Sequence, residues 1–185
     1  MSPALLVIAA IVALILLWAW FTFNRFIRQR NLTREAWSGV DVQLKRRHDL
    51  VPRLVECVKG YKGYEASLLE NLTTARASAQ AAQGVAAAGK AETGVTQSLK
   101  ALFAVAEAYP DLKAARSFQD LSAALIEIED QLQYARRYYN GTVRDYKILA
   151  ESFPSRLVAG LFGFCPDGFF EVESSMERQA PDVKL

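Results

Sequence analysis

The stretch "SFQDLSAALIEIEDQLQYARRYYNGTVRDY", residues 117–146, establishes the fold class. Its apolar side chains recur at steps of 3, 4, 3, 4, 3, 4, 4 and 3, in the order Phe118, Leu121, Leu125, Ile128, Leu132, Ala135, Tyr139, Val143 and Tyr146. Seven residues per two turns is the spacing of a coiled-coil seam. The pattern predicts a helix roughly 50 Å long, which begins near Ser117 and ends at Phe153-Pro154.

A second helical pattern lies in "DVQLKRRHDLVPRLVECVKGY", residues 41–61. The apolar stripe contains Trp37, Val40, Leu44, Val51, Val55 and Val58. The position missing from its seven-residue step falls at Arg47 or His48, so the charged run crosses the stripe. Pro52 disfavours helical geometry at the preceding residue, and Asp49 is a suitable N-cap. We therefore expect one helix to end or kink near His48 and another to run from Asp49 to about Ala82.

The rest of the bundle is less regular. Residues 78–95, "SAQAAQGVAAAGKAETGV", are low in complexity and predict a flexible loop, followed by a short helix from about Gln97 to Tyr109. The predicted fold is all-α: an N-terminal transmembrane helix followed by an elongated antiparallel helical bundle with long arms.

The N-terminus carries a candidate membrane anchor. Residues 4–23, "ALLVIAAIVALILLWAWFTF", contain no charge and are long enough to cross a hydrocarbon core of roughly 30 Å. The run is too long for a cleaved signal peptide, and aromatic residues occupy its end. The predicted division is a transmembrane anchor at 1–23, the helical bundle at 24–172 and a C-terminal tail at 173–185.

The distribution of charge predicts the orientation of this anchor. Residues 24–64 hold ten Lys or Arg against four acidic residues, a net charge of +6. Positive residues beside a span stay on the cytoplasmic side. We expect a single-pass membrane protein, in contact with membrane lipid, with its N-terminus outside and its bundle in the cytoplasm.

The residues needed for several kinds of chemistry are missing. One histidine, His48, cannot supply a di-iron bundle, and Cys57 and Cys165 form no metal-binding pair. The basic run lacks the interleaved aromatics that stack on nucleic acid. We expect no enzymatic activity, no cofactor or metal, no small-molecule substrate and no nucleic-acid partner.

The charged run is instead predicted to be a structural polar lock. Charges inside an apolar stripe need partners, because an unpaired buried charge is costly. The predicted lock consists of Arg46, Arg47, Asp49, Arg136 and Asn140. We expect Asp49 to cap a helix and to pair with Arg46 or Arg136, so that Asp49→Ala clearly lowers the melting temperature.

An aromatic segment, "RLVAGLFGFCPDGFFEVE" at residues 156–173, follows the second arm. It is a cap that folds back on the bundle, an exposed patch that contacts another subunit or lipid, or both. We predict that Phe162, Phe164 and Phe169 contribute to subunit contacts.

Three motifs resemble the LemA family of bacterial membrane-anchored helical proteins: "EAWSGVDVQLKRRHDLVPRLVECVKGY", "ARRYYNGTVRDY" and "SFPSRLVAGLFGF…FFE". The resemblance covers about residues 24–172, with small departures at Arg53 and Arg156. It implies a long-armed bundle behind one span, usually cytoplasmic, with no established enzymatic activity. Some members are tied to membrane organelle formation, and family genes often lie near those of membrane proteases.

Together these observations predict a non-enzymatic, membrane-anchored helical scaffold that self-associates as a homo-oligomer at the bacterial inner membrane. The alternative is an adaptor that presents clients to a membrane protease or another integral membrane partner.

Overall fold

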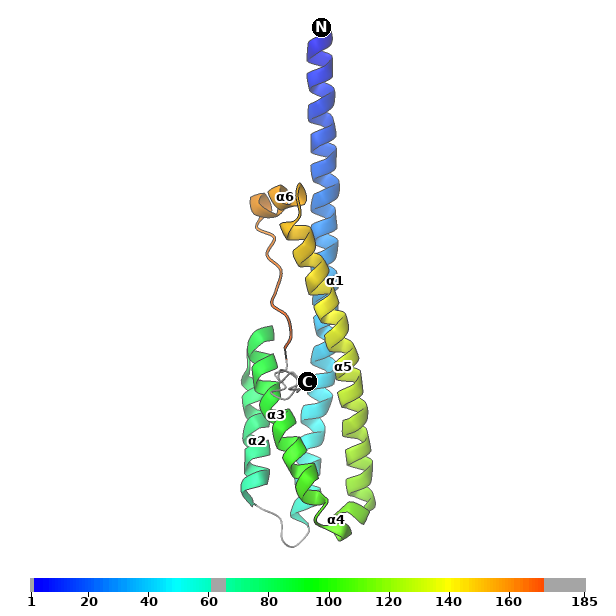
Figure 1. Cartoon of the computed structure of the whole chain (residues 1–185), viewed down its shortest axis with the longest axis vertical. Coiled ribbons are helices and arrows are strands. Elements are labelled where there is room, and N and C mark those ends of the chain that lie inside the picture. Colours follow the sequence, from blue (N-terminus) through cyan, green and yellow to red (C-terminus); the bar gives the residue numbers. More distant parts are fainter. Residues whose placement is uncertain (1, 61–65, 172–185) are drawn as a thin grey trace, which may run out of the picture. The chain divides into compact units, whose positions relative to one another are not determined.

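The computed structural model describes residues 2–60 and 66–171, and these form helices and no strand (Figure 1). The helices are α1 (Pro3–Lys59), α2 (Ala66–Ala81), α3 (Val85–Ala106), α4 (Pro110–Ala114), α5 (Arg116–Glu151) and α6 (Ser155–Phe162). The all-α prediction is confirmed, and α5 matches the long helix that its apolar spacing predicts. The chain divides into two compact units, described separately below.

Unit 1 comprises residues 2–39 and 137–167, and unit 2 comprises residues 40–60, 66–136 and 168–171. Helices α1 and α5 each contribute to both units. The predicted tail at 173–185 lies outside the described residues.

In unit 2, four helices surround one apolar core. The core joins Val51, Leu54, Val55 and Val58 of α1, Leu69, Leu72 and Ala79 of α2, Val95, Leu99, Leu102 and Ala106 of α3, and Phe118 and Leu125 of α5, with Leu112 of α4 at its side. Burial of these side chains is the main stabilising term for such a bundle. The apolar stripes therefore meet in a common centre.

The predicted flexible loop at 78–95 is wrong. Helix α2 continues to Ala81, and α3 begins at Val85, directly after Gly84. Gly84 has a φ of 83°, a conformation that glycine adopts at little cost, so the reversal between the two helices is short. Alanine is the best helix former, and the segment's low complexity here means an alanine-rich helix rather than a loop.

The predicted break in the first arm is also wrong. Helix α1 is continuous from Pro3 to Lys59 with Pro52 inside it, and α2 begins only at Ala66. A proline within a helix leaves the carbonyl four residues earlier without its usual donor. That carbonyl belongs to His48, and it accepts a hydrogen bond of 2.7 Å from Nε of Arg76 on α2. The side chain of a neighbouring helix thus replaces the bond that Pro52 cannot make.

Unit 1 has its own aromatic core, in which α1, α5 and α6 meet. The buried residues are Phe26, Tyr146, Leu149, Val158, Ala159 and Phe164. The rings of Phe26 and Phe164 stack with centroids 4.7 Å apart. Phe164 is therefore a core residue of its own chain, and its predicted place in a subunit interface is wrong. The cap interpretation holds for this residue.

The other two predicted interface residues differ from Phe164. Phe162 is about half exposed, and the edge of its ring meets Phe23 at 4.9 Å between centroids. Phe169 belongs to unit 2 and is partly buried. Only Phe162 therefore combines a contact within the unit with a large exposed apolar surface.

The N-terminal part of α1 is long and apolar enough to cross a membrane. In Figure 1 it extends beyond α6 with no other helix of unit 1 beside it. The side chains from Leu5 to Phe21 are largely exposed to their surroundings. An all-round apolar helix that packs against nothing is typical of a membrane span.

Candidate functional site

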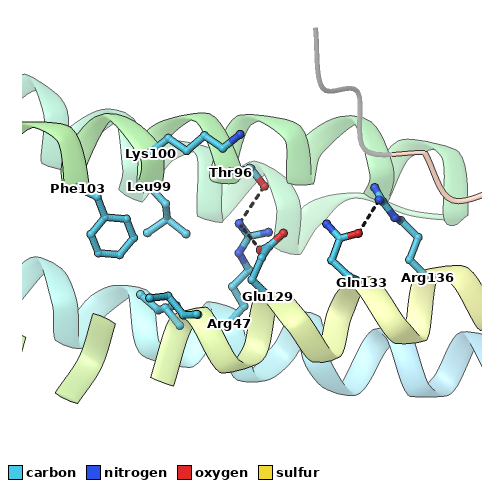
Figure 2. A pocket seen from close by; sticks show the side chains of 10 residues that line it. Arg47, Thr96, Leu99, Lys100, Phe103, Glu129, Gln133 and Arg136 are labelled. Carbon is cyan, nitrogen blue, oxygen red and sulfur yellow. Dashed lines mark hydrogen bonds and ion pairs between the residues drawn. The ribbon is translucent and has the colours of Figure 1, made fainter. Parts of the chain in front are cut away.

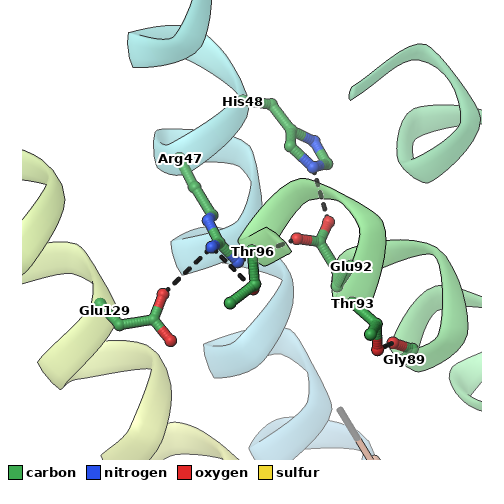
Figure 3. A network of polar contacts seen from close by, with 7 residues as sticks. All are labelled: Arg47, His48, Gly89, Glu92, Thr93, Thr96 and Glu129. Carbon is green, nitrogen blue, oxygen red and sulfur yellow. Dashed lines mark hydrogen bonds and ion pairs between the residues drawn. The ribbon is translucent and has the colours of Figure 1, made fainter. Parts of the chain in front are cut away.

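A buried charge network lies in unit 2, where α1, α3 and α5 face one another (Figure 3). Its centre is Arg47, whose side chain is only 4% exposed. Nη1 lies 3.2 Å from Oε2 of Glu92, and Nη2 lies 3.2 Å from Oε2 of Glu129. Nη2 also donates a 2.9 Å hydrogen bond to the hydroxyl of Thr96. One guanidinium thus joins three helices.

Glu92 of α3 also contacts a second side chain of α1, the imidazole of His48. Its Oε1 lies 2.6 Å from Nε2 of His48, the residue next to Arg47 on α1. A carboxylate can only accept hydrogen bonds, so the ionised Glu92 requires the proton of the imidazole at Nε2. Glu92 is 1% exposed, yet both of its oxygens are bonded. Full pairing of this kind is what permits a buried carboxylate.

The network extends through the backbone to the fourth helix. The carbonyl of His48 accepts the bond from Arg76 of α2, as described above. Residues 47 and 48 therefore tie α1 to α2, α3 and α5. Because hydrogen bonds to charged groups are directional, this arrangement allows a single register of the four helices.

A groove of about 360 Å³ opens beside Arg47 (Figure 2). The apolar part of its wall comes from Leu99, Phe103, Leu125 and Ile126, and the polar part from Arg47, Thr96, Lys100, Glu129, Gln133 and Arg136. Arg136 donates a 2.7 Å bond to Gln133 on its own helix. The groove presents three cations and one carboxylate beside an apolar strip.

Each acidic side chain of the network is paired with a basic one. Glu92 bonds to Arg47 and His48, and Glu129 bonds to Arg47. Within residues 2–60 and 66–171, no group of three or more His, Cys, Asp or Glu side chains is arranged to hold a metal ion. The paired charges of the network can hold the helices of unit 2 in position.

Of the five residues of the predicted polar lock, Arg47 alone lies in the buried charge network. Arg47 crosses the buried stripe, as its position indicates, but Arg46 and Asp49 are exposed and form no side-chain hydrogen bond or ion pair with the part of the chain that the structure describes. Because α1 is continuous, Asp49 lies about 200° around the helix from Arg47. Its predicted cap and arginine partner are therefore wrong.

The other two lock residues lie elsewhere. Arg136 lines the groove and is only partly buried, whereas Asn140 belongs to unit 1. The structure thus does not bring the five predicted residues into one cluster.

Sequence reasoning missed the residues that pair with Arg47 and His48. Glu92 lies in the segment predicted as a loop, and Glu129 is not among the predicted lock residues. A signal for Glu92 was present: Ala88, Glu92, Val95, Leu99, Leu102 and Ala106 recur at steps of 4, 3, 4, 3 and 4. When one apolar stripe contains an acidic residue and another contains a basic residue, the two residues are candidates for a buried ion pair.

Comparison with known proteins identifies the family. The LemA family model matches residues 36–185. Magnetosome protein MamQ 2 of Paramagnetospirillum magneticum is 23% identical over 189 residues, which cover 88% of this chain and 68% of that relative. Magnetosome protein MamQ of Magnetospirillum gryphiswaldense is 22% identical over the same length.

A further relative is Protein LemA of Metamycoplasma hominis. It is 27% identical over 135 residues, which cover 72% of this chain and 58% of that protein. The family-model match at residues 36–185 includes Arg47, His48 and Glu92. With a family model that extends over most of its length, this chain belongs to the LemA family.

Proposed function

We propose that this protein is a non-enzymatic, membrane-anchored helical scaffold that self-associates at the bacterial inner membrane. The proposal rests on where the charged and the apolar side chains lie. The buried charges pair with one another inside unit 2, whereas a long apolar helix of unit 1 is uncovered. Such a chain offers a rigid body and an anchor rather than a reaction site. The similarity to proteins named for the magnetosome supports a structural role at a membrane.

Self-association requires a surface outside the span. On α5, Ile126 and Tyr134 are each 62% exposed and lie a little over two turns apart. Large apolar side chains on one side of a helix are typical of a contact with another chain. We assign the contact between copies to this side of α5 within unit 2.

The size of the purified particle tests the scaffold proposal. The full chain in detergent should form a homo-assembly of defined mass, measured by light scattering after size exclusion. Ile126→Glu with Tyr134→Glu should reduce this mass without loss of helicity. Gln131→Glu, an exposed polar position of the same helix, is the matched control and should leave the mass unchanged. A wild-type chain that is monomeric at all concentrations would contradict self-association.

The second candidate is an adaptor that presents clients to a membrane protease or another integral membrane protein. The groove beside Arg47 favours it, because an apolar strip edged by cations suits an extended segment with acidic side chains. A monomer that co-purifies with one membrane protein would support the adaptor. Lys100→Glu should then abolish that association without changing the melting temperature.

The proposed orientation places the N-terminus outside and the bundle in the cytoplasm. Arg25 and Arg28, just past the apolar segment, are exposed and support this direction. A reporter enzyme that works only in the cytoplasm should be active when it is fused after Leu185. Activity of a periplasmic reporter at that position would overturn the orientation.

A further inference from the structure

Helix α6 has an exposed apolar side that nothing in unit 1 covers. Its inward side holds Ser155, Val158 and Ala159, which are buried. On the outward side Leu157 is 63% exposed and Leu161 is 79% exposed. These two residues are one turn apart and therefore lie on the same stripe. The helix therefore presents apolar side chains on both its inner and its outer side.

The position of α6 in unit 1 is set by the end of the apolar segment. Phe23 is the last residue of that segment, and its ring contacts Phe162 at 4.9 Å and Phe164 at 5.4 Å between centroids. The next turn of α1 supplies Phe26, which stacks on Phe164. The same unit thus holds α6 at the level where the span ends.

Phe153, in the turn before α6, extends this exposed apolar surface. It is 82% exposed and lines a cavity of about 490 Å³ together with Trp18, Thr22 and Arg25 of α1. Asp145 of α5 also lines this cavity. Trp18 and Arg25 are the residue types that occupy the boundary between headgroups and acyl chains. Phe153 is therefore next to groups suited to that boundary.

We propose that the outer side of α6 is a membrane-interface contact, in which Phe153, Leu157 and Leu161 insert among the lipid headgroups and upper acyl chains. The occupant is lipid because this surface is continuous with the uncovered apolar segment of α1 through Phe23 and Phe162. Arg156, exposed on the same helix, is placed to reach lipid phosphate. This inference rests on the proposed membrane anchoring and adds a second attachment, which would hold α6 flat on the bilayer.

Such a contact would restrain the anchored protein as well as add affinity. A single span leaves a protein free to rotate and tilt at its exit from the membrane. Two points of attachment in one rigid unit define an orientation.

Depth-dependent quenching tests the proposal. A bimane label is placed on single cysteines in a full-length chain that carries Cys57→Ala and Cys165→Ser and retains the parent's helicity and melting temperature. The labelled positions are Leu157→Cys, Leu161→Cys, Leu14→Cys within the apolar segment and Glu35→Cys. Glu35 is exposed and lies twelve residues beyond Phe23, roughly 18 Å along α1. The protein is reconstituted in phosphatidylcholine–phosphatidylglycerol vesicles that contain nitroxide lipids.

We expect labels at 157 and 161 to lose most of their fluorescence to a nitroxide near the headgroup, and Leu14→Cys to one near the bilayer centre. Glu35→Cys should keep its fluorescence. The losses at 157 and 161 should not depend on the protein-to-lipid ratio. If only Leu14→Cys is quenched, α6 does not touch the bilayer and the inference is overturned while anchoring stands.

Two other outcomes also oppose the proposal. If Leu14→Cys is not quenched either, anchoring and the α6 contact both fail. If label 161 is shielded only at high protein density and position 161 forms disulfides between copies, a second copy covers the surface instead of lipid.

Discussion

Nε of Arg76 donates a 2.7 Å hydrogen bond to the backbone carbonyl of His48, the group that Pro52 leaves without a helical donor. This contact explains how α1 passes through a proline without ending. It also places His48 and Arg47 where α3 and α5 can reach them. The buried charge network therefore depends on a continuous α1.

Replacement of Arg76 should be costly only while Pro52 is present. Arg76→Met removes the donor and should lower the free energy of unfolding by about 1.5–3 kcal/mol, the range for a hydrogen bond that involves a charged group. In a Pro52→Ala background the amide of residue 52 supplies the bond, and Arg76→Met should then cost much less. Urea denaturation of the four proteins, followed by circular dichroism, measures this coupling; equal costs in both backgrounds would show that the bond is not compensatory.

Loss of Glu92 should be the most damaging single change in unit 2. Glu92→Ala leaves His48 without its carboxylate partner and Arg47 with Glu129 and Thr96 alone, and it should cost about 3–5 kcal/mol. Glu92→Gln keeps the shape and should cost less. Asp49→Ala, at an exposed position of α1, is the control and should stay within about 0.5 kcal/mol of the parent. Similar melting temperatures for Glu92→Ala and Asp49→Ala would contradict the importance of the network.

Gly89 should not tolerate a side chain, although it lies inside a helix. A Cβ at this position would meet the backbone carbonyl of Glu171, so α3 or the segment at 168–171 must shift. We expect Gly89→Ala to destabilise unit 2 and to speed hydrogen exchange around residues 168–171. In Gly94→Ala the new Cβ would lie 3.7 Å from that of Ala75, an ordinary contact. That control should stabilise the protein by up to about 1 kcal/mol.

Phe164 and Phe162 should respond differently to truncation. Phe164 is buried against Phe26 and Phe23, so Phe164→Ala should cost about 3–5 kcal/mol. Phe162 is half exposed, and Phe162→Ala should cost much less. Thermal unfolding of the full chain in detergent compares the two, and equal effects would argue against the assignment of Phe164 to the core of unit 1.

Tyr139 should make stability fall at high pH. It is fully buried against Trp37, and burial, with the charge of Asp167 as the second cause, raises the pKa of its hydroxyl from 10.0 to about 12. Between these values the unfolded chain releases a proton that the folded chain retains, so the free energy of unfolding decreases as pH rises. Below pH 10 the contribution is fully present. Tyr139→Phe should remove this component, seen as a flatter pH profile of urea midpoints from pH 10 to 12; an unchanged profile would contradict it.

Local periodicity predicted α5, and the bounds of α1, α2 and α3 were not predicted by it. The spacing from Phe118 to Tyr146 is a property of the chain itself, and α5 follows it. The uncharged apolar run at residues 4–23 likewise indicates a membrane span without reference to the rest of the chain. The gap in the stripe at Arg47 correctly indicated that charge enters the core.

The partners of those charges depended on the folded chain. Asp49 was the nearest acid in the sequence, but a continuous helix turns it away from Arg47. Glu92 lies 45 residues from Arg47 along the chain, and only the packing of α3 against α1 brings their side chains together. In the same way, Pro52 is compatible with a helix only because Arg76 approaches from α2. Periodicity reports which side of a helix is buried, whereas the contact between two buried sides is a property of the tertiary structure.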